Sequence, residues 1–400
     1  MPLNPADDPA HGPATPAPAA HELRLRFVGS GSEYFRIWIV NLLLTLVTVG
    51  LYYPFAKVRR LRYFHNATEV GGAPLSFHAD PWKMFRGYVL VVLMLAAYSG
   101  AGHFSATAGL IAFVIVAALW PALWHSSMRF RLANTGWRGL RFRYTGTRGQ
   151  AYAVMAVPIG VAALFVVLTL LVAPEAPPAP DAPPAPSEPA WGDILLGLAP
   201  LAVMLAAMPF FLWLLKRQQH RHYALGDEHT AFDVGLGRFY GFWLRNMGVG
   251  LLVMLGFFGL GALFLWGLGA TGRSPAGAPV LATITLILAY LVFFALVGGH
   301  FTARLQNLVW NGTASRHLRF DSRLRARDLA GLWFTNTLFT ALTLGLYFPF
   351  AQVNSARLRL EAVRVHASID PDDLVAAAGR ADEAAAGDAA GDLLGFDIGL

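Results

Sequence analysis

The chain contains no cysteine, so it can form no disulfide and no thiolate metal site. It is also poor in charge, because Asp, Glu, Lys and Arg make up 14% of its 400 residues, where a soluble domain has about a quarter. Hydrophobic residues make up 56%. A shortage of charge over so long a chain argues against a soluble domain and predicts a polytopic membrane protein.

Long apolar runs occur along most of the chain, and several approach the ~20 residues that cross a bilayer. They occupy residues 88–98, 110–124, 151–172, 194–215, 247–268 and 280–297, with two further runs around Leu43 and Phe339. The sequence therefore predicts an all-α polytopic membrane protein with eight hydrophobic helical segments. Three transmembrane hairpins would be flanked by two similar end segments.

The basic residues are almost all arginine, and they cluster between the apolar runs. The clusters lie in residues 57–86, 129–148, 216–245 and 304–327. The intervening connections near residues 99–108, 174–193 and 270–279 carry few basic residues or none. Because basic loops stay on the cytoplasmic side, the hairpins should leave the cytoplasm and return to it. This topology accounts for the net charge of +7, and we expect no nucleic-acid partner.

Shifts in composition divide the chain into a membrane domain and two tails. Residues 1–22 are rich in Pro and Ala and predict a disordered tail, whereas residues 23–367 form the multi-pass domain. Within that domain, residues 173–192 predict an external Pro-rich loop. Residues 368–400 form an acidic, Ala-rich tail, which we expect to fold back onto the basic cytoplasmic loops.

Two stretches near the ends of the chain are almost the same. They read Thr48-Val-Gly-Leu-Tyr-Tyr-Pro-Phe-Ala-Lys-Val58 and Thr343-Leu-Gly-Leu-Tyr-Phe-Pro-Phe-Ala-Gln-Val353. The glycine can adopt the left-handed conformation that ends a helix, and the proline suits the first turn of the next helix. The aromatic residues are typical of a membrane interface. Each stretch therefore predicts a helical elbow at the cytoplasmic interface.

The two end segments also share a polar stripe. The residues concerned are Asn41, Thr45 and Thr48 in the first segment and Asn336, Thr340 and Thr343 in the last. Spacings of four and three place each set on one face of a helix. Because Asn and Thr in a membrane face protein or water, two interpretations stand. Either each stripe packs helices together through hydrogen bonds, or the two stripes line a shared pathway or ligand site.

The first elbow is followed by a cluster of positive charge made of Lys57, Arg59, Arg60 and Arg62. A basic residue near an anionic lipid surface gains ~1 kcal/mol. The cluster is a candidate for binding anionic lipid headgroups, although arginines at this place can also act only as topology signals.

The end segments can be placed in two ways. If each crosses the membrane once, both termini lie outside, and if each enters and returns, both lie inside. The length from Arg36 to Phe55 favours a crossing, whereas Arg24, Arg26 and Arg36 before the first segment favour a return. We favour termini inside.

Short Leu-x-Phe stretches recur in the basic loops and before the first segment. They are Leu25–Phe27, Leu75–Phe77, Leu140–Phe142 and Leu318–Phe320. The alternation predicts short strands or hairpins at the membrane surface. The recurrence of strand, membrane excursion and arginine-rich exit also indicates an internal repeat.

The block from Phe27 to Thr68, which includes Asn41-Leu-Leu-Leu-Thr45 and the first elbow, resembles the YjgN family of bacterial inner-membrane proteins. The resemblance covers residues 23–367, with Phe55 where family members tend to have Trp. It implies a multi-pass protein of the bacterial inner membrane. The family's membrane domain has no known function, so the resemblance supplies no activity and no catalytic residue.

Motifs for catalysis are missing from the sequence. It has no His-Glu-x-x-His, no Gly-x-x-x-x-Gly-Lys-Ser/Thr and no Gly-x-Ser-x-Gly. The apolar cores also lack the ionised residues that energised transporters use. We therefore expect neither an enzyme nor a cofactor or metal. Two functions remain: passive or weakly coupled transport of a small solute or lipid, or a scaffold that binds anionic lipid or partner proteins through its arginine-rich loops.

Overall fold

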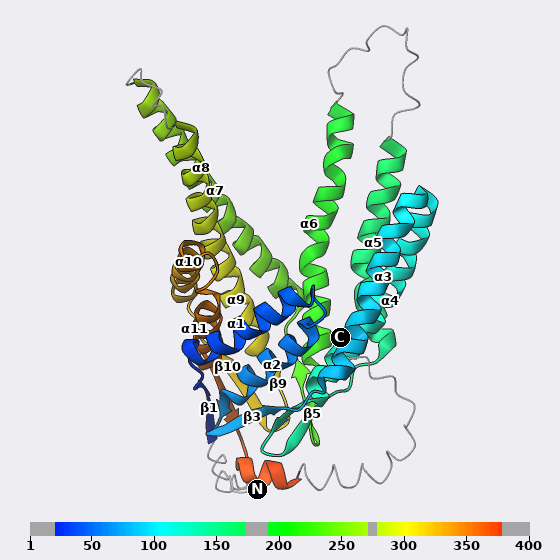
Figure 1. Ribbon diagram of the computed structural model, residues 1–400, viewed down its shortest axis with the longest axis vertical. Helices are drawn as coiled ribbons and strands as arrows, with labels where there is room; N and C mark the ends of the chain where they lie inside the picture. Colours follow the sequence, from blue (N-terminus) through cyan, green and yellow to red (C-terminus); the bar gives the residue numbers. More distant parts are fainter. Residues whose placement is uncertain (1–20, 173–190, 271–277, 378–400) are drawn as a thin grey trace, which may run out of the picture.

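The computed structural model describes residues 21–172, 191–270 and 278–377, so most of the two predicted tails and of the predicted external loop lie outside the described residues. The protein is predominantly helical, as predicted (Figure 1). The helices are α1 (Gly31–Val47), α2 (Tyr53–Asn66), α3 (Pro81–Phe104), α4 (Ala106–Ala133), α5 (Arg148–Val172), α6 (Trp191–His220), α7 (Leu236–Ala270), α8 (Ala278–Phe293), α9 (Gly299–Trp310), α10 (Ala326–Leu342) and α11 (Phe348–Glu361). A π-helical segment, Phe294–Gly298, joins α8 to α9.

Short strands lie between the helices. They are β1 (His21–Phe27), β2 (Thr68–Val70), β3 (Ala73–Phe77), β4 (Thr135–Trp137), β5 (Leu140–Tyr144), β6 (Tyr223–Leu225), β7 (Glu228–His229), β8 (Ala231–Phe232), β9 (Thr313–Ala314), β10 (Leu318–Ser322) and β11 (Val363–Ala367). All four predicted Leu-x-Phe stretches are confirmed as strands, in β1, β3, β5 and β10. The sequence did not predict that the strands join.

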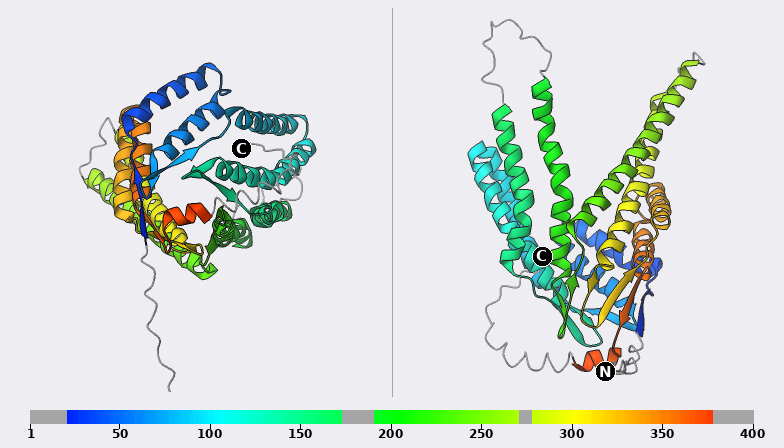
Figure 2. Two further views of the ribbon diagram at one scale, coloured as in Figure 1. Left: turned by 90° about the horizontal axis from the view of Figure 1, so that it is seen from below. Right: turned by 180° about the vertical axis from the view of Figure 1, so that it is seen from behind.

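The strands form one sheet in the order β7-β6-β5-β4-β3-β2-β1-β11-β10-β9-β8. The two edge strands, β7 and β8, are consecutive in the chain, and Thr230 is the one residue between them. The chain itself therefore connects the two edges of the sheet, and we call the result the ring. Neighbouring strands are antiparallel, including β1 and β11, where His21 lies opposite Ala367. Seen from below, the helices are arranged around this ring (Figure 2).

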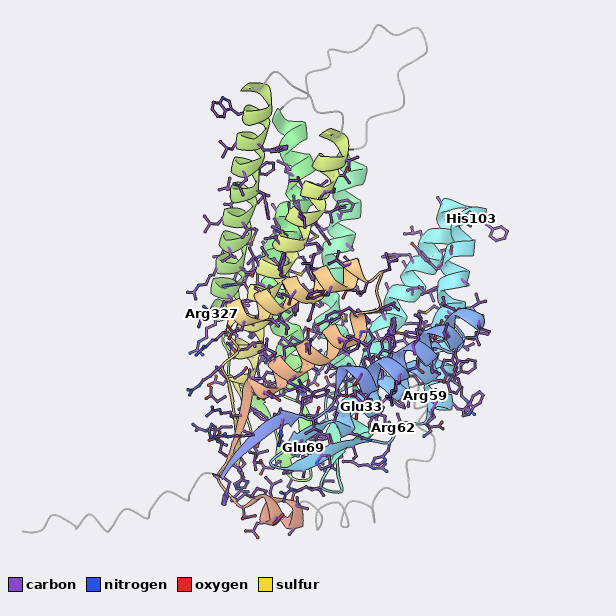
Figure 3. All side chains as sticks on the ribbon, turned by 60° about the vertical axis from the view of Figure 1, so that its left-hand side comes forward. Glu33, Arg59, Arg62, Glu69, His103 and Arg327 are labelled. Carbon is purple, nitrogen blue, oxygen red and sulfur yellow. The ribbon has the colours of Figure 1, made fainter. Side chains whose placement is uncertain are left out.

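Six helical stretches among the described residues are long and apolar enough to cross a membrane. They are Pro81–Phe104, Ala106–Ala133, Arg148–Phe165, Leu198–His220, Leu236–Phe264 and Thr283–Trp310. All rise from one side of the sheet, and His103 lies near the far tip of α3 (Figures 1 and 3). Their apolar side chains are mostly exposed, Leu252 and Leu286 to more than 70%, as expected of a surface that faces lipid. This supports a polytopic membrane protein.

The two end segments form helical hairpins rather than long single helices. α1 and α10 have 17 residues each. Both run across the direction of the long helices (Figures 1 and 3). The chain turns back at the predicted elbows, where Gly50 has φ +88° and Gly345 has φ +93°, and Pro54 lies in the first turn of α2 as predicted. Each hairpin begins and ends at the sheet, because β1 pairs with β2 and β10 with β11.

The start of the predicted acidic tail packs on the sheet. Residues 371–377 are helical, and Leu374 is buried against Trp137, Leu140 and Leu225 on the ring. Asp372 pairs with Arg138 of the β4–β5 turn. This part of the tail does lie on a basic loop, whereas residues 378–400 are outside the described ranges.

Candidate functional site

Five helices end at the ring and surround a central cavity of about 860 Å³. These helices are α2, α4, α6, α9 and α11, and each is followed directly by a strand. The last turns of α2, α4 and α9 are fixed in the same way. The hydroxyls of Thr68, Thr135 and Thr313 each donate to the carbonyl four residues earlier, at 2.7–2.8 Å. The cavity thus lies between the helix ends and the inner face of the strands.

The strands contribute mainly apolar side chains to the cavity. Strand side chains alternate between faces, and Leu25, Leu75 and Leu318 point inward while neighbours such as Arg26 and Arg319 are exposed outside. Phe142 and Phe320 complete this wall. The ring therefore has an apolar inner face and a basic outer face.

The helix ends add positive charge to this apolar cavity. Arg131 on α4, Lys216 on α6 and Arg359 on α11 all line it. Among the described residues, none of the three has a carboxylate within salt-bridge distance. Lys216 Nζ donates to Gln219 Oε1 at 3.1 Å, and Arg359 Nε donates to Gln306 Oε1 at 3.0 Å. Neutral amides thus orient two of the cations without balancing their charge.

Electrostatic effects at the cavity follow from this arrangement. Desolvation by the surrounding protein lowers the pKa of the Arg359 guanidinium, which remains charged. Burial, together with the charges of Arg131 and Arg60, lowers the pKa of Lys57. The cavity's one lining carboxylate among the described residues, Glu228, is held by hydrogen bonds from Ser315 and His317. The cavity is therefore electropositive.

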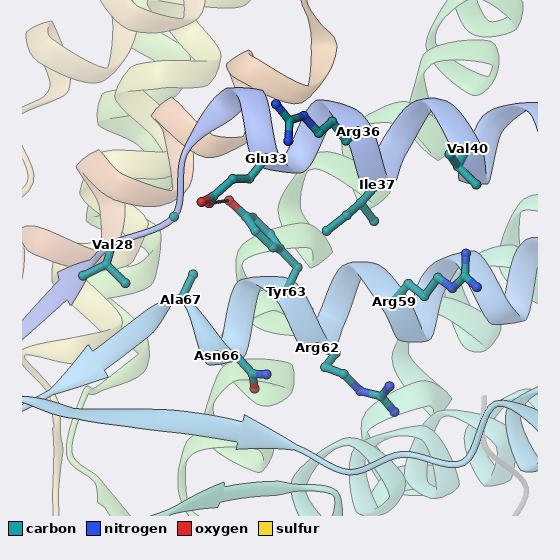
Figure 4. A pocket seen from close by; sticks show the side chains of 11 residues that line it. Val28, Glu33, Arg36, Ile37, Val40, Arg59, Arg62, Tyr63, Asn66 and Ala67 are labelled. Carbon is teal, nitrogen blue, oxygen red and sulfur yellow. Dashed lines mark hydrogen bonds between the residues drawn. The ribbon is translucent and has the colours of Figure 1, made fainter.

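The predicted headgroup cluster divides between the two faces of α2. Arg59 and Arg62 lie in an outer groove of about 700 Å³ between α1 and α2, where Arg36 joins them (Figure 4). Lys57 is instead half-buried, and Arg60, although exposed, lines a second hollow. The sequence did not predict this division.

The second hollow, which we call the side groove, lies between α2, α10 and α11 and has a volume of about 580 Å³. Asn336 and Thr340 of the predicted stripe line it, together with Trp333 and Phe348. Three residues of this groove, Leu61, Ala356 and Arg359, also line the central cavity. The side groove and the cavity are therefore adjacent at Arg359.

The threonines of the polar stripes make their hydrogen bonds within their own helix or elbow. The Thr45 and Thr340 hydroxyls donate to the carbonyls of Asn41 and Asn336 at 2.7 and 2.6 Å. Asn336 Nδ2 also donates to the Ala351 carbonyl of α11 at 3.2 Å. In the turns, the Thr48 and Thr343 hydroxyls accept from the backbone N–H four residues later. Of these bonds, that of Asn336 alone joins two helices, and both interpretations of the stripes stay predictions.

Sequence reasoning missed the cavity residues on the helix ends, although the sequence holds a signal for them. The residues three and seven positions before the first residue of the following strand line the cavity on all five helices. They are His65 and Leu61, Leu132 and Met128, His220 and Lys216, Trp310 and Gln306, and Leu360 and Ala356. Aligning the five helix ends would have placed these residues on one helix face.

No group of three or more His, Asp or Glu side chains among the described residues could hold a metal ion. The cavity's histidines serve other purposes, since His220 Nδ1 lies 3.0 Å from the buried Thr313 hydroxyl. The arrangement can bind an anion or an amphiphile, because cations and apolar side chains line one cavity.

These features define a class, a multi-pass membrane protein whose loop strands close a ring beneath its transmembrane helices. A family model described as "Bacterial protein of unknown function (DUF898)" matches residues 22–393. The chain belongs to this family.

Curated relatives agree with the predicted resemblance. The chain is 28% identical to Inner membrane protein YjgN of Salmonella typhimurium over 154 residues, which are 38% of this chain and 39% of that protein. It is 26% identical to Inner membrane protein YjgN of Escherichia coli strain K12 over 149 residues, 36% of this chain and 37% of that protein. The alignments span less than half of these relatives. No solved structure matches. The chain is a multi-pass inner-membrane protein, as predicted.

Proposed function

We propose that the protein mediates passive or weakly coupled transport of a small solute or lipid, and that it is not an enzyme. One observation carries the proposal: the side groove, which opens beside α10, shares Leu61, Ala356 and Arg359 with the central cavity. A molecule held in the groove would therefore lie against residues that also line the cavity. The apolar cores lack ionised residues for ion coupling, which favours passive movement.

The proposal includes a topology of eight segments, in which the two end hairpins enter the cytoplasmic leaflet and return. Their tips are apolar and exposed, with Val49 at 90% and Leu344 at 95%. Exposed apolar side chains at a turn are favourable when they insert among lipid chains. The hairpins would then open the side groove directly to the membrane.

A vesicle assay with a fluorescent phosphatidylglycerol tests the proposal. Thr340→Trp fills the side groove, and we expect it to reduce transbilayer movement to the rate of protein-free vesicles. Thr335→Trp is the matched control, because Thr335 is exposed on the same helix, α10, and is not among the residues that line the groove. Both variants should elute as the wild-type protein does on size exclusion. Equal movement with all three proteins would contradict transport through the groove.

The second candidate function is a membrane-organising scaffold that binds anionic lipid or partner proteins. It is favoured by the outer groove, where Arg36, Arg59 and Arg62 gather at one surface (Figure 4). Replacing Arg59 and Arg62 with Gln should weaken the retention of anionic lipid if this candidate is correct. The same change should leave lipid movement intact if transport runs through the side groove.

A further inference from the structure

Among the described residues, no carboxylate lies within salt-bridge distance of the three cations in the central cavity. Arg131, Lys216 and Arg359 belong to three different helices, yet all line the same space. Like charges that face one space repel one another. A bound anion would relieve this repulsion, and charge-assisted hydrogen bonds to a carboxylate or phosphate are among the strongest available.

The walls around these charges point to more than an inorganic anion. The strand side chains Leu25, Leu75, Phe142, Leu318 and Phe320 give the cavity a continuous apolar surface. A free phosphate would leave this surface without a partner, whereas an acyl or alkyl chain would cover it and remove its apolar area from water.

We infer that the central cavity binds an anionic amphiphile, with its carboxylate or phosphate head at Lys216 and Arg359 and one acyl or alkyl chain against the strand side chains. The inference deepens the proposed function and rests on it, since it names the class of molecule carried. The volume of about 860 Å³ lies within the ~300–1,000 Å³ of small-molecule sites, which suits one chain and its head.

The position of Arg359 gives the head a defined place on the route. Arg359 lies where the side groove meets the cavity. An anionic head entering from the groove would meet this guanidinium first, and Lys216 lines the same cavity. On the ring itself, Leu374 packs against Trp137, Leu140 and Leu225.

Photo-crosslinking of the full-length protein in phosphatidylcholine nanodiscs tests this site. A fatty acid that carries a diazirine on its chain should label peptides of β5 and β10, and oleoyl lysophosphatidate should compete as well as oleate does. Oleyl alcohol and inorganic phosphate should compete at least about tenfold less well. Equal competition by oleyl alcohol would overturn the role of the cations, and full competition by inorganic phosphate would replace the amphiphile with a free anion.

Variants can distinguish an effect of the cavity cations from an effect of any positive charge on the protein. Replacing Lys216 and Arg359 with Gln should reduce the cross-link about tenfold. Arg359→Lys in the otherwise wild-type chain keeps the charge and should retain the cross-link. The control pair is Arg26→Gln with Arg319→Gln, since these residues are exposed on the outer face of the ring. A cross-link that survives the cavity variant, or falls equally in the control, contradicts the inference.

The two proposals can fail separately. If labelling depends on Lys216 and Arg359 but no lipid movement occurs, the binding site stands and transport fails. If movement depends on Thr340 but labelling is indifferent to both cations, transport stands and the amphiphile site is wrong.

Discussion

Near the point where the two edges of the sheet meet, the Glu228 carboxylate links β7 to the turn between β9 and β10. It lies on β7, and its Oε2 accepts from Ser315 Oγ at 2.5 Å while Oε1 lies 2.5 Å from His317 Nδ1. Ser315 and His317 belong to the turn between β9 and β10. Burial alone would raise the pKa of Glu228, but these hydrogen bonds outweigh burial and lower that pKa. The ionised carboxylate therefore stabilises the closure.

The hydrogen bonds of the Glu228 carboxylate predict that the free energy of unfolding depends on pH. Because the pKa of Glu228 is lower in the folded protein, its stabilisation is complete above about pH 4.3, the ordinary glutamate pKa, and is lost as the pH falls through the folded value. Glu228→Gln should cost about 1–3 kcal/mol at pH 7 and make the acid decline shallower. Unfolding midpoints measured between neutral and acidic pH check this. Glu69→Gln on β2 is the control, and an unchanged acid profile in Glu228→Gln would contradict the closure.

Substitution of glycine by alanine should change the free energy of unfolding in opposite directions at two positions. Gly345 at the second elbow has φ +93°, whereas Gly331 lies in α10, and an added Cβ meets no atom within 4 Å at either position. Gly345→Ala should therefore destabilise the protein by ~1–2 kcal/mol through backbone strain alone. Gly331→Ala should stabilise it by ~0.5–1 kcal/mol. Thermal unfolding of both variants measures the difference, and equal shifts would show that the elbow does not constrain the backbone.

At the scale of the element, the features that could be predicted are those that depend on residues close together in the sequence. The Leu-x-Phe alternation predicted β1, β3, β5 and β10, and the Gly-aromatic-Pro pattern predicted both elbows, because turns and alternation depend on neighbouring residues. β7, β8 and β9 have two residues each, which is too short for any periodic pattern. These strands complete the ring, so the closed sheet could not be predicted from local patterns.

The contacts of the helical segment 371–377 predict which substitution would release this segment from the ring. Leu374 is 3% exposed, and Asp372 pairs with Arg138. Leu374→Asp should release the segment, because an unpaired buried carboxylate is strongly unfavourable. Trypsin should then cleave faster at Arg138. Ala376→Asp adds the same charge at an exposed position and should leave cleavage unchanged. Equal cleavage rates in the wild type and both variants would count against docking of the segment.

At the scale of the whole molecule, the fold depends on contacts between distant parts of the chain. β1 pairs with β11 across nearly the full length of the domain, from His21 to Ala367. Such pairings leave no local trace in one sequence, which is why the closed ring around the cavity was not predicted. The charge pattern did predict that the basic loops share one side, and they meet there in the ring.

The most direct test of the account is the side of the membrane on which the ring lies. The natural absence of cysteine allows single-cysteine variants at Arg26 on β1, Arg319 on β10 and Ala106 at the far tip of the α3–α4 hairpin. All three residues are exposed. A membrane-impermeant maleimide applied to cells with a permeable outer membrane and an intact inner membrane should label Ala106→Cys alone. The other two should react only after the inner membrane is opened. Labelling of Arg26→Cys before opening would place β1 outside and contradict a single cytoplasmic ring.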